Sequence, residues 1–166
     1  METILPYEEQ VAVLLSKGFA IWDIVQSCHR PGSLDSDISK ELPNDIRGFC
    51  NDHPTIERIV FSNGGTGCKF FNKHFKSWWE SGELTVYSGN DESARAFKSV
   101  AKYSVAASKT KSIHNGQRRR TIDCISALSV SPAAARYSFA EKRDFWDQHV
   151  YTPGLLLHEN NKLKED

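Results

Sequence analysis

Residues Gly18 to Ile38, GFAIWDIVQSCHRPGSLDSDI, join a short apolar segment to a loop that is rich in small polar side chains. The apolar segment predicts a buried strand over Phe19–Val25, and Pro31-Gly32 predicts a turn in the loop that follows. Ligands of open α/β sheets bind beyond the carboxyl ends of the strands, so this loop is a candidate binding site. An ordinary hydrophilic connection is an equally permissible reading of its composition. The polar candidates in and just before the loop are Asp23, Cys28, Ser33, Asp35 and Ser36.

The rest of the chain alternates short apolar runs with helical segments. Further strands are predicted over Glu57–Ser62, Leu84–Tyr87 and Arg120–Leu128. This alternation predicts a three-layer α/β/α fold with a small, mostly parallel sheet. Helices are predicted over Pro6–Lys17, from Asn44 (as N-cap) to Asp52, from the Asn63–Gly67 turn to about Glu80, and over Phe139–Val150, where Ser138 and Glu141 form a capping box.

The predicted domain organisation is simple. A chain of 166 residues forms one domain by the usual length prior, here residues 1–155. A basic insertion occupies about residues 90–119, with a weak helical pattern over Phe97–Ala107. Residues 156–166 form a polar tail, which we expect to be frayed.

Four stretches in a fixed order resemble one known family. WDIVQSC followed by RPGSLDSDI, FSNGGTGCKFF at Phe61–Phe71, LTVYS at Leu84–Ser88 and ALSVSPAAARYSFAEKRDFW at Ala127–Trp146 are similar to segments of the uracil-DNA glycosylase superfamily. Within it, the similarity is to the hypoxanthine-DNA glycosylase (DNA-deoxyinosine glycosylase) branch, with mismatch-specific uracil-DNA glycosylases as more distant relatives.

This resemblance implies a uracil-DNA glycosylase-like fold and a monofunctional repair enzyme that hydrolyses the N-glycosidic bond of a deaminated base, hypoxanthine or uracil. Such an enzyme extrudes the base from the duplex into a pocket. The implied partner is double-stranded DNA containing that base, bound by a monomer that uses no cofactor and no metal. The implied base-binding residues are Cys28, Ser33, Asp35, Ser36, Asn63 and Gly64, and the implied DNA-binding loop contains Ser129, Ser131 and Pro132.

The sequence also departs from the family pattern. The family's first motif, which carries its catalytic asparagine on a central strand, has no counterpart upstream of the helix at Pro6. The pattern would have proline at Leu128 and asparagine at Ala134. Either a fragment of a longer protein or a divergent member that has lost chemistry would explain this. We therefore expect weak DNA binding and poor or no base excision, with Asp23 and Asp35 as the nearby carboxylates that could substitute.

Charge is unevenly distributed along a chain whose formal net charge is zero. From Ser93 to Ile122 there are basic residues and no acidic one. This segment could bind DNA phosphates locally, with Arg118, Arg119 and Arg120 as the predicted contacts, or it could be a solvated loop. The basic residues are Arg95, Lys98, Lys102, Lys109, Lys111, Arg118, Arg119 and Arg120.

Several function classes are disfavoured by composition. The four cysteines show no CxxC pairing, so they are predicted to be reduced thiols without a metal, typical of an intracellular protein (cytoplasmic or nuclear, not secreted). No apolar run approaches the length of a membrane span, about 18 residues.

Two alternatives to a glycosylase stay open. One is a non-catalytic relative that binds DNA or a base, and the other is a small α/β protein that binds a nucleotide or anion at the Asn63–Gly67 turn. In each case we expect the loop Cys28–Ser36, the turn Asn63–Gly64 and the loop Ser129–Ala133 to converge on one pocket.

Overall fold

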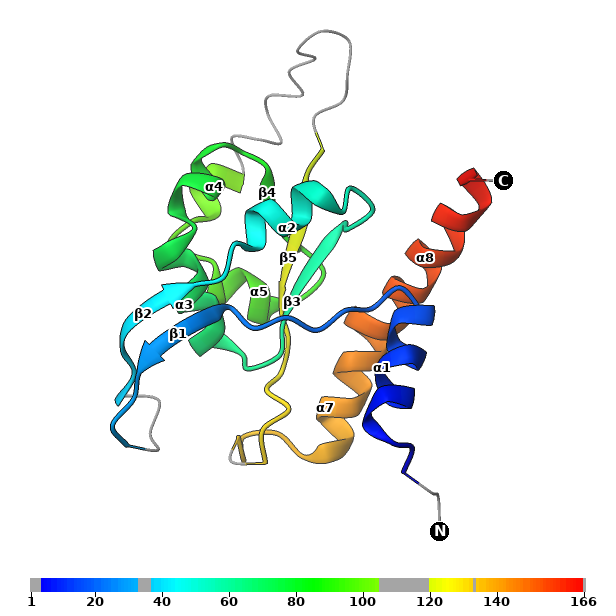
Figure 1. The fold of residues 1–166 in the computed structure, drawn as a ribbon, viewed down its shortest axis with the longest axis horizontal. Helices are drawn as coiled ribbons and strands as arrows, with labels where there is room; N and C mark the ends of the chain where they lie inside the picture. Colours follow the sequence, from blue (N-terminus) through cyan, green and yellow to red (C-terminus); the bar gives the residue numbers. More distant parts are fainter. Residues whose placement is uncertain (1–3, 33–36, 105–119, 133, 166) are drawn as a thin grey trace, which may run out of the picture.

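The centre of the protein is a parallel sheet of three strands in the order β3-β5-β4 (Figure 1). The computed structural model describes residues 4–32, 37–104, 120–132 and 134–165. The strands are β3 (Arg58–Phe61), β4 (Leu84–Val86) and β5 (Ile122–Ser126). The predictions of strands over residues 57–62, 84–87 and 120–128 are therefore confirmed. The mixed α/β architecture is consistent with the predicted three-layer class.

Helices α3 (Gly65–His74), α4 (Lys76–Glu80) and α5 (Asp91–Ala96) contact the sheet or one another. Aromatic rings form this layer: the ring centroid of Phe61 lies 4.9 Å from that of Phe71 and 5.5 Å from that of Phe97. Burying each such ring stabilises the fold by about 1.5–3 kcal/mol. Phe97 and Ser93 are fully buried, so the beginning of the segment assigned to a basic insertion contributes to the core.

The C-terminal helices contact the residues that follow β4 and β5, since His149 packs against Tyr87 and Trp146 bonds to Leu128. Here α7 (Phe139–Trp146), the π-helix η2 (Asp147–Tyr151) and α8 (Thr152–Glu165) follow one another without a break. The predicted capping box at Ser138 is present, and its hydrogen bonds to Glu141 hold the pKa of that carboxyl below its usual value. The Trp146 indole donates to the carbonyl of Leu128 (2.9 Å), and Val150 is buried. The residues for which we expected a frayed tail belong to α8, which continues to Glu165.

Helix α8 is held by the beginning of the chain. Figure 1 shows α1 (Tyr7–Ser16), which was predicted from the sequence, beside the C-terminal helices. Gly18 has a φ of 78°, and a Cβ built there would lie 2.7 Å from Nδ1 of His158. The same imidazole lies 3.2 Å from the carbonyl oxygen of Ser16. Glycine at position 18 therefore allows the chain to turn directly against α8.

The prediction of a strand over Phe19–Val25 is wrong for residues 19–24, which form no strand. Strand β1 begins at Val25 and ends at His29, and it pairs antiparallel with β2 (Ser39–Pro43) in a separate two-stranded sheet. Helical partners explain the difference: the ring of Phe19 packs against Tyr151 (5.9 Å between centroids), and Trp22 packs against Phe49 (4.6 Å). These contacts hold the segment outside the parallel sheet.

Two helix boundaries also differ from the prediction. Helix α2 (Ile46–Asp52) is capped by Asp45, whose carboxylate accepts a hydrogen bond from the Gly48 N–H at 2.9 Å, rather than by Asn44. Asn44 instead donates its side-chain amide to the carbonyl of Asp23 (2.8 Å). The helix expected to continue to Glu80 divides at Phe75, which ends α3 and begins α4.

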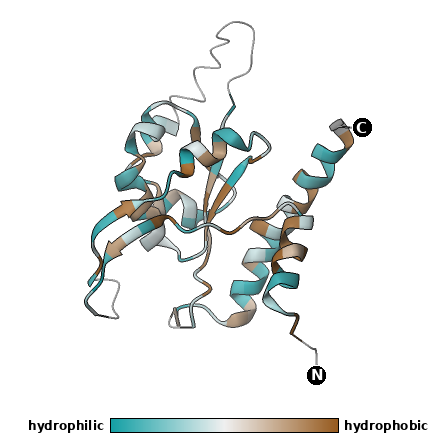
Figure 2. Cartoon of the chain, viewed as in Figure 1, coloured by the Kyte–Doolittle hydropathy of each residue, from teal (hydrophilic) through white to brown (hydrophobic). Residues whose placement is uncertain are grey.

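Hydropathy follows this arrangement. Figure 2 shows hydrophobic residues along β3 and β5 in the interior of the molecule. On the face towards α3, Ile59 and Phe61 of β3 alternate with Arg58 and Val60, which point to the other face. Arg58, Asp123 and Thr85 share a register across the three strands, and Thr85 donates to the Asp123 carboxylate at 2.7 Å. A polar row therefore crosses the face of the sheet opposite to that of Phe61.

The hairpin of β1 and β2 is tied to α3 by an ion pair, which generates a prediction about pH. The Lys73 ammonium donates to the Glu41 carboxylate, and this bond is the main reason that the pKa of Glu41 falls from 4.5 to about 2. Because the folded-state pKa is depressed, the stabilisation is complete above pH 4.5 and is lost as pH falls towards 2. We expect an NMR titration to keep the Glu41 carboxyl ionised at pH 3, and Lys73→Met to return its midpoint towards 4.5. An unchanged midpoint in that variant would contradict the pairing.

Candidate functional site

The Asn63-Gly64-Gly65 turn lies at the carboxyl end of β3, beside the loop that follows β5. Gly64 has a φ of 64°, a conformation that residues with a side chain rarely adopt. A Cβ built on Gly64 would lie 3.7 Å from the carbonyl oxygen of Ala127 and 4.0 Å from Cβ of Ser129. The Val130 N–H donates to the carbonyl of Ser62 at 3.1 Å. The turn and the loop are therefore joined at one edge of the sheet.

The Asn63 side chain is exposed and folds back over the first turn of α3. A Cβ built on Gly67 would lie 2.0 Å from Oδ1 of Asn63, so the carboxamide occupies the space that glycine leaves. The N-cap residue of this ten-residue helix is Gly64, which makes no side-chain capping hydrogen bond. The first turn of a helix presents backbone N–H groups without intrahelical partners, and these favour an anionic or carbonyl oxygen. Donors and an amide acceptor thus lie together at the turn.

The loop after β5 is fixed by backbone and lysine contacts. The Ser131 carbonyl accepts hydrogen bonds from the Lys142 ammonium (3.0 Å) and from the Ala134 N–H (3.1 Å). The Ser131 N–H donates to Oγ of Ser129 at 3.3 Å. Ser131 and Pro132 are exposed, and Ser129 is half-buried. The loop therefore places Ser131 and Pro132 at the surface next to the Asn63 turn.

The third segment expected at this site does not join it in the described part of the chain. Cys28 is an exposed residue of β1, and the β1–β2 hairpin extends away from the parallel sheet (Figure 1). Asp23 is exposed, and the contact described for it is between its backbone and Asn44. Three further predicted residues of the loop, Ser33, Asp35 and Ser36, lie outside the described residues, as does Ala133. The structure thus brings together two of the three segments.

We expected Arg120 to contact phosphate. In the structure its side chain makes hydrogen bonds within the protein. Its guanidinium donates to the carbonyls of Cys50 (2.8 Å), His53 (3.2 Å) and Ile56, where α2 ends. Arginine near a helix C-terminus satisfies carbonyls that have no intrahelical partner. Arg120 precedes β5, at the opposite end of the strand from Ser129. Arg118 and Arg119 lie outside the described residues.

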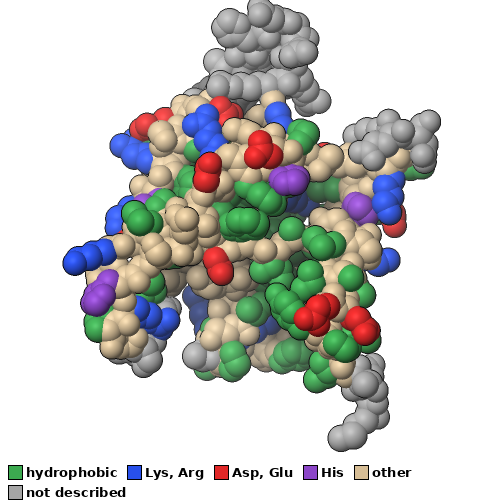
Figure 3. All heavy atoms as spheres, in the orientation of Figure 1, with side chains coloured by type: hydrophobic (Ala, Val, Ile, Leu, Met, Phe, Trp, Pro, Cys, Tyr) green, Lys and Arg blue, Asp and Glu red, His purple; other side chains and the backbone are tan. Residues whose placement is uncertain are grey.

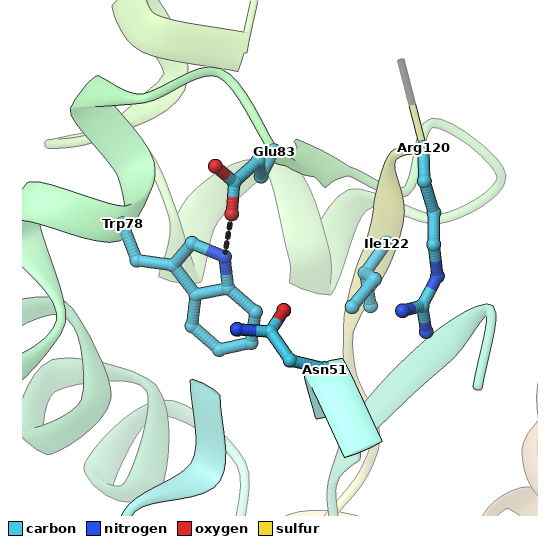
Figure 4. A pocket seen from close by; sticks show the side chains of 5 residues that line it. All are labelled: Asn51, Trp78, Glu83, Arg120 and Ile122. Atoms are coloured by element: carbon cyan, nitrogen blue, oxygen red, sulfur yellow. Dashed lines mark hydrogen bonds between the residues drawn. The ribbon is translucent and has the colours of Figure 1, made fainter. Parts of the chain in front are cut away.

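A small cavity of about 200 Å³ lies near Arg120, at the edge where β4 and β5 begin (Figure 4). The Glu83 carboxylate, which lines the cavity, accepts hydrogen bonds from the Trp78 indole (2.9 Å) and from Arg47 (2.9 Å). These polar groups are engaged with one another, and the cavity lies at the other edge of the sheet from Asn63. It is therefore separate from the candidate site. Its lining residues are Asn51, Trp78, Glu83, Arg120 and Ile122.

Sequence reasoning missed two basic residues beside the loop. Lys142 anchors Ser131 from α7, and Arg136 is exposed with its guanidinium 5.2 Å from the centre of the Tyr137 ring. The Tyr137 hydroxyl donates to Glu92 at 2.9 Å, which ties this part of the loop to α5. Both cations lie within the stretch Ala127–Trp146, so their closeness to Ser131 in sequence was the available signal.

Metal and thiol chemistry find little support in the described residues. Nowhere in residues 4–32, 37–104, 120–132 and 134–165 do three or more His, Cys, Asp or Glu side chains gather as a metal would require. Burial raises the pKa of Cys68 to about 11 and that of Cys124 well above its ordinary value, which disfavours the reactive thiolates. In the same part of the chain, the structure contains no helix with the length and apolar character needed to cross a membrane.

Comparisons of the chain with protein-family models, curated proteins and solved structures gave no match.

The contacts of Arg120 generate a prediction about stability. We expect Arg120→Met to lower the free energy of unfolding by about 1–3 kcal/mol, because carbonyls at the end of α2 lose charged donors. Urea denaturation followed by circular dichroism measures the change. Arg143→Met, which removes an exposed arginine paired with Asp144, is the matched control and should change stability by about 0.5 kcal/mol or less. An Arg120→Met variant of normal stability with weakened DNA binding would restore the phosphate role.

The fit between Gly67 and Asn63 generates a second prediction. Gly67→Ala should displace the Asn63 carboxamide, since the new Cβ would overlap Oδ1, while alanine favours the helix by about 0.5–1 kcal/mol. We expect shifted side-chain amide resonances of Asn63 without loss of thermal stability. Gly65→Ala is the matched control, because nothing lies within 4 Å of a Cβ built there. A destabilised Gly67→Ala variant with unshifted Asn63 resonances would show that the backbone adjusts instead.

Proposed function

We propose that the chain is a DNA-binding domain of uracil-DNA glycosylase type, which recognises a deaminated base at the carboxyl edge of its parallel sheet. The observation that carries the proposal is that the turn after β3 and the loop after β5 adjoin at one edge of the sheet, where the Val130 N–H donates to the Ser62 carbonyl at 3.1 Å. The residues that resemble the family's base-recognising turn and its DNA-gripping loop are distant in sequence and adjacent in space. The order of the four resembling stretches supports the same assignment.

The groups at the site suit an extruded base. Enzymes that act on a base flip it out of the duplex and read its hydrogen-bonding edge. The Asn63 carboxamide can donate and accept, which matches the carbonyl and N–H pattern shared by hypoxanthine and uracil. The first-turn N–H groups of α3 can bind an oxygen of the base or of a phosphate. Hydroxyl groups of Ser129 and Ser131 can bind phosphate oxygens and hold the strand in place.

Binding is better supported than bond cleavage. Hydrolysis of a glycosidic bond needs a group that positions water, and such positioning contributes strongly to the rate. The side chains at the joined turn and loop supply amide and hydroxyl groups but no general base. Asp23 is exposed beside Asn44, and Asp35 lies outside the described residues. This observation favours the alternative of a DNA- or base-binding relative with slow or no excision.

Binding to matched duplexes tests the proposal. Three duplexes of one sequence, carrying deoxyinosine, deoxyuridine or no modification, are titrated by fluorescence anisotropy, and strand nicking after alkali reports excision. We expect Asn63→Ala to reduce the preference for a modified duplex about tenfold, since a lost base contact is worth about 1–2 kcal/mol, and to leave unmodified duplex binding unchanged. Asn160→Ala, an exposed asparagine of α8, is the matched control.

Salt dependence separates phosphate contacts from base contacts. Arg136→Ala should weaken binding to all three duplexes equally and reduce the salt slope by about one. Affinity that does not depend on salt, or equal affinity of the natural chain for all three duplexes, would contradict the proposal. Tight binding of a free nucleotide with no duplex binding would favour the nucleotide- or anion-binding alternative.

A further inference from the structure

Helix α3 presents a line of exposed side chains that starts at the Asn63 turn. Thr66, Lys69 and Lys73 are exposed, while other residues of the helix are buried in the core. Residues three and four apart lie on one face of a helix, so these three side chains form a single line, here called the α3 row. At about 1.5 Å per residue the row is about 10 Å long, which corresponds to about three nucleotides of a DNA strand at about 3.4 Å each.

The charge of the α3 row is positive and only partly neutralised. Between Arg58 and Glu80 the sequence has no acidic residue. The Lys69 ammonium makes no ion pair or hydrogen bond in the part of the chain that the structure describes. Lys73 bonds to Glu41, yet the lysine side chain is 64% exposed and that of the glutamate 15%, so the lysine faces solvent. An ammonium has three N–H donors, so Lys73 keeps donors for a ligand.

The composition of this surface favours a polyanion over a protein partner. In the described chain, the large exposed hydrophobic side chains include none from α3. The cores of protein–protein interfaces are rich in aromatic residues and arginine and poor in lysine, whereas lysine binds phosphate as a point charge. Figure 3 shows Lys and Arg side chains along the margin of the molecule that α4 and the β1–β2 hairpin form, and both elements contact α3. The positive surface therefore continues beyond the row.

Position separates the α3 row from an ordinary solvated helix face. The helix begins directly after the Asn63-Gly64 turn, and Lys69 lies about 6 Å along its axis from Gly65. A base that is extruded into a pocket stays attached to its strand through the neighbouring phosphates. These phosphates lie at the rim of the proposed site, and on the side of α3 the row supplies exposed donors to them.

We infer that the α3 row binds consecutive phosphates of the DNA strand whose base enters the candidate site, with Lys69 as its main contact. The Thr66 hydroxyl and the two ammonium groups donate to phosphate oxygens, which positions the strand without reading its sequence. The inference rests on the proposed function and adds to it a set of phosphate contacts besides the loop at Ser131.

Binding of two duplexes, one unmodified and one containing deoxyuridine, over a range of salt concentrations tests the inference. Lys69→Ala should weaken binding to both duplexes about fivefold and reduce the salt slope by about one, and Lys69→Glu should weaken binding further. Lys162→Ala, which removes an exposed lysine of α8, is the matched control and should leave the affinity and the slope unchanged. Circular dichroism checks that each variant keeps its fold.

The pair of Glu41 and Lys73 provides a test in the opposite direction. Glu41→Gln removes a negative charge beside the row, so it should strengthen binding to both duplexes about twofold. A purely structural role of the pair would leave binding unchanged or weaken it, and either result would remove Lys73 from the inferred contacts. Glu159→Gln, at an exposed glutamate of α8, is the matched control and should have no effect.

The outcomes separate this inference from the proposed function. Unchanged affinity and salt slope in Lys69→Glu, when the natural chain binds duplex, would overturn the inference and leave the proposed function standing. Equal affinity for the two duplexes together with the expected Lys69 effect would support the row and contradict recognition of a deaminated base. Absence of duplex binding by the natural chain would contradict both. Polyglutamate that displaces the duplex at equal charge concentration would favour an acidic protein partner and overturn the inference.

Discussion

The rest of the described structure depends on the hydrogen bonding of β5, because this strand pairs with a parallel neighbour on each side. Its Ile122, Cys124 and Ile125 side chains are buried. Beyond the ladder, the Ser126 N–H donates to Oγ of Ser93 at 2.9 Å, so α5 is attached to the strand through a buried serine. The strand thereby fixes helices as well as its two neighbours.

The two ends of β5 serve different purposes. Before the strand, Arg120 satisfies the last carbonyls of α2, and after it, Ala127 and Val130 hold the turn that follows β3. The polar row of Arg58, Asp123 and Thr85 crosses the middle of the same strand. The candidate site is therefore held in place by the sheet itself, since its turn and its loop each continue directly from one of two paired strands.

The parallel strands were predictable because each is a short apolar run bounded by polar residues or glycine. Phe19–Val25 has similar composition, yet its first residues form no strand, because Phe19 and Trp22 pack against rings contributed by Tyr151 and Phe49. A local pattern cannot reveal such distant partners. The glycines after Asn63 correctly predicted a turn, and the capping box correctly predicted the start of α7, because both signals are local in sequence. The break at Phe75 and the continuation of α8 depend on tertiary packing.

The same limit explains the outcome at the candidate site. Residue types predicted the Asn63 turn and the serine-proline loop, and their common position after parallel strands predicted that they meet. Arg120 showed its charge in the sequence but not its acceptors, which are 64 to 70 residues away along the chain. The positions of Lys142 and Arg136 beside the candidate site were missed although both residues are close to Ser131 in sequence. Charged residues are common in helices and loops, so only the structure distinguishes these two by their position beside the loop at Ser131.

The uninterrupted passage from α7 through η2 to α8 makes residues 139–165 one continuous helical rod. Near one end, Lys142 and Trp146 hold the loop that approaches Asn63. Farther along, the imidazole of His158 touches the backbone at the end of α1. The rod therefore connects the end of α1 to the loop of the candidate site through contacts at both of its ends. Loosening the π-helical junction would uncouple these two parts while leaving the contacts at each end intact.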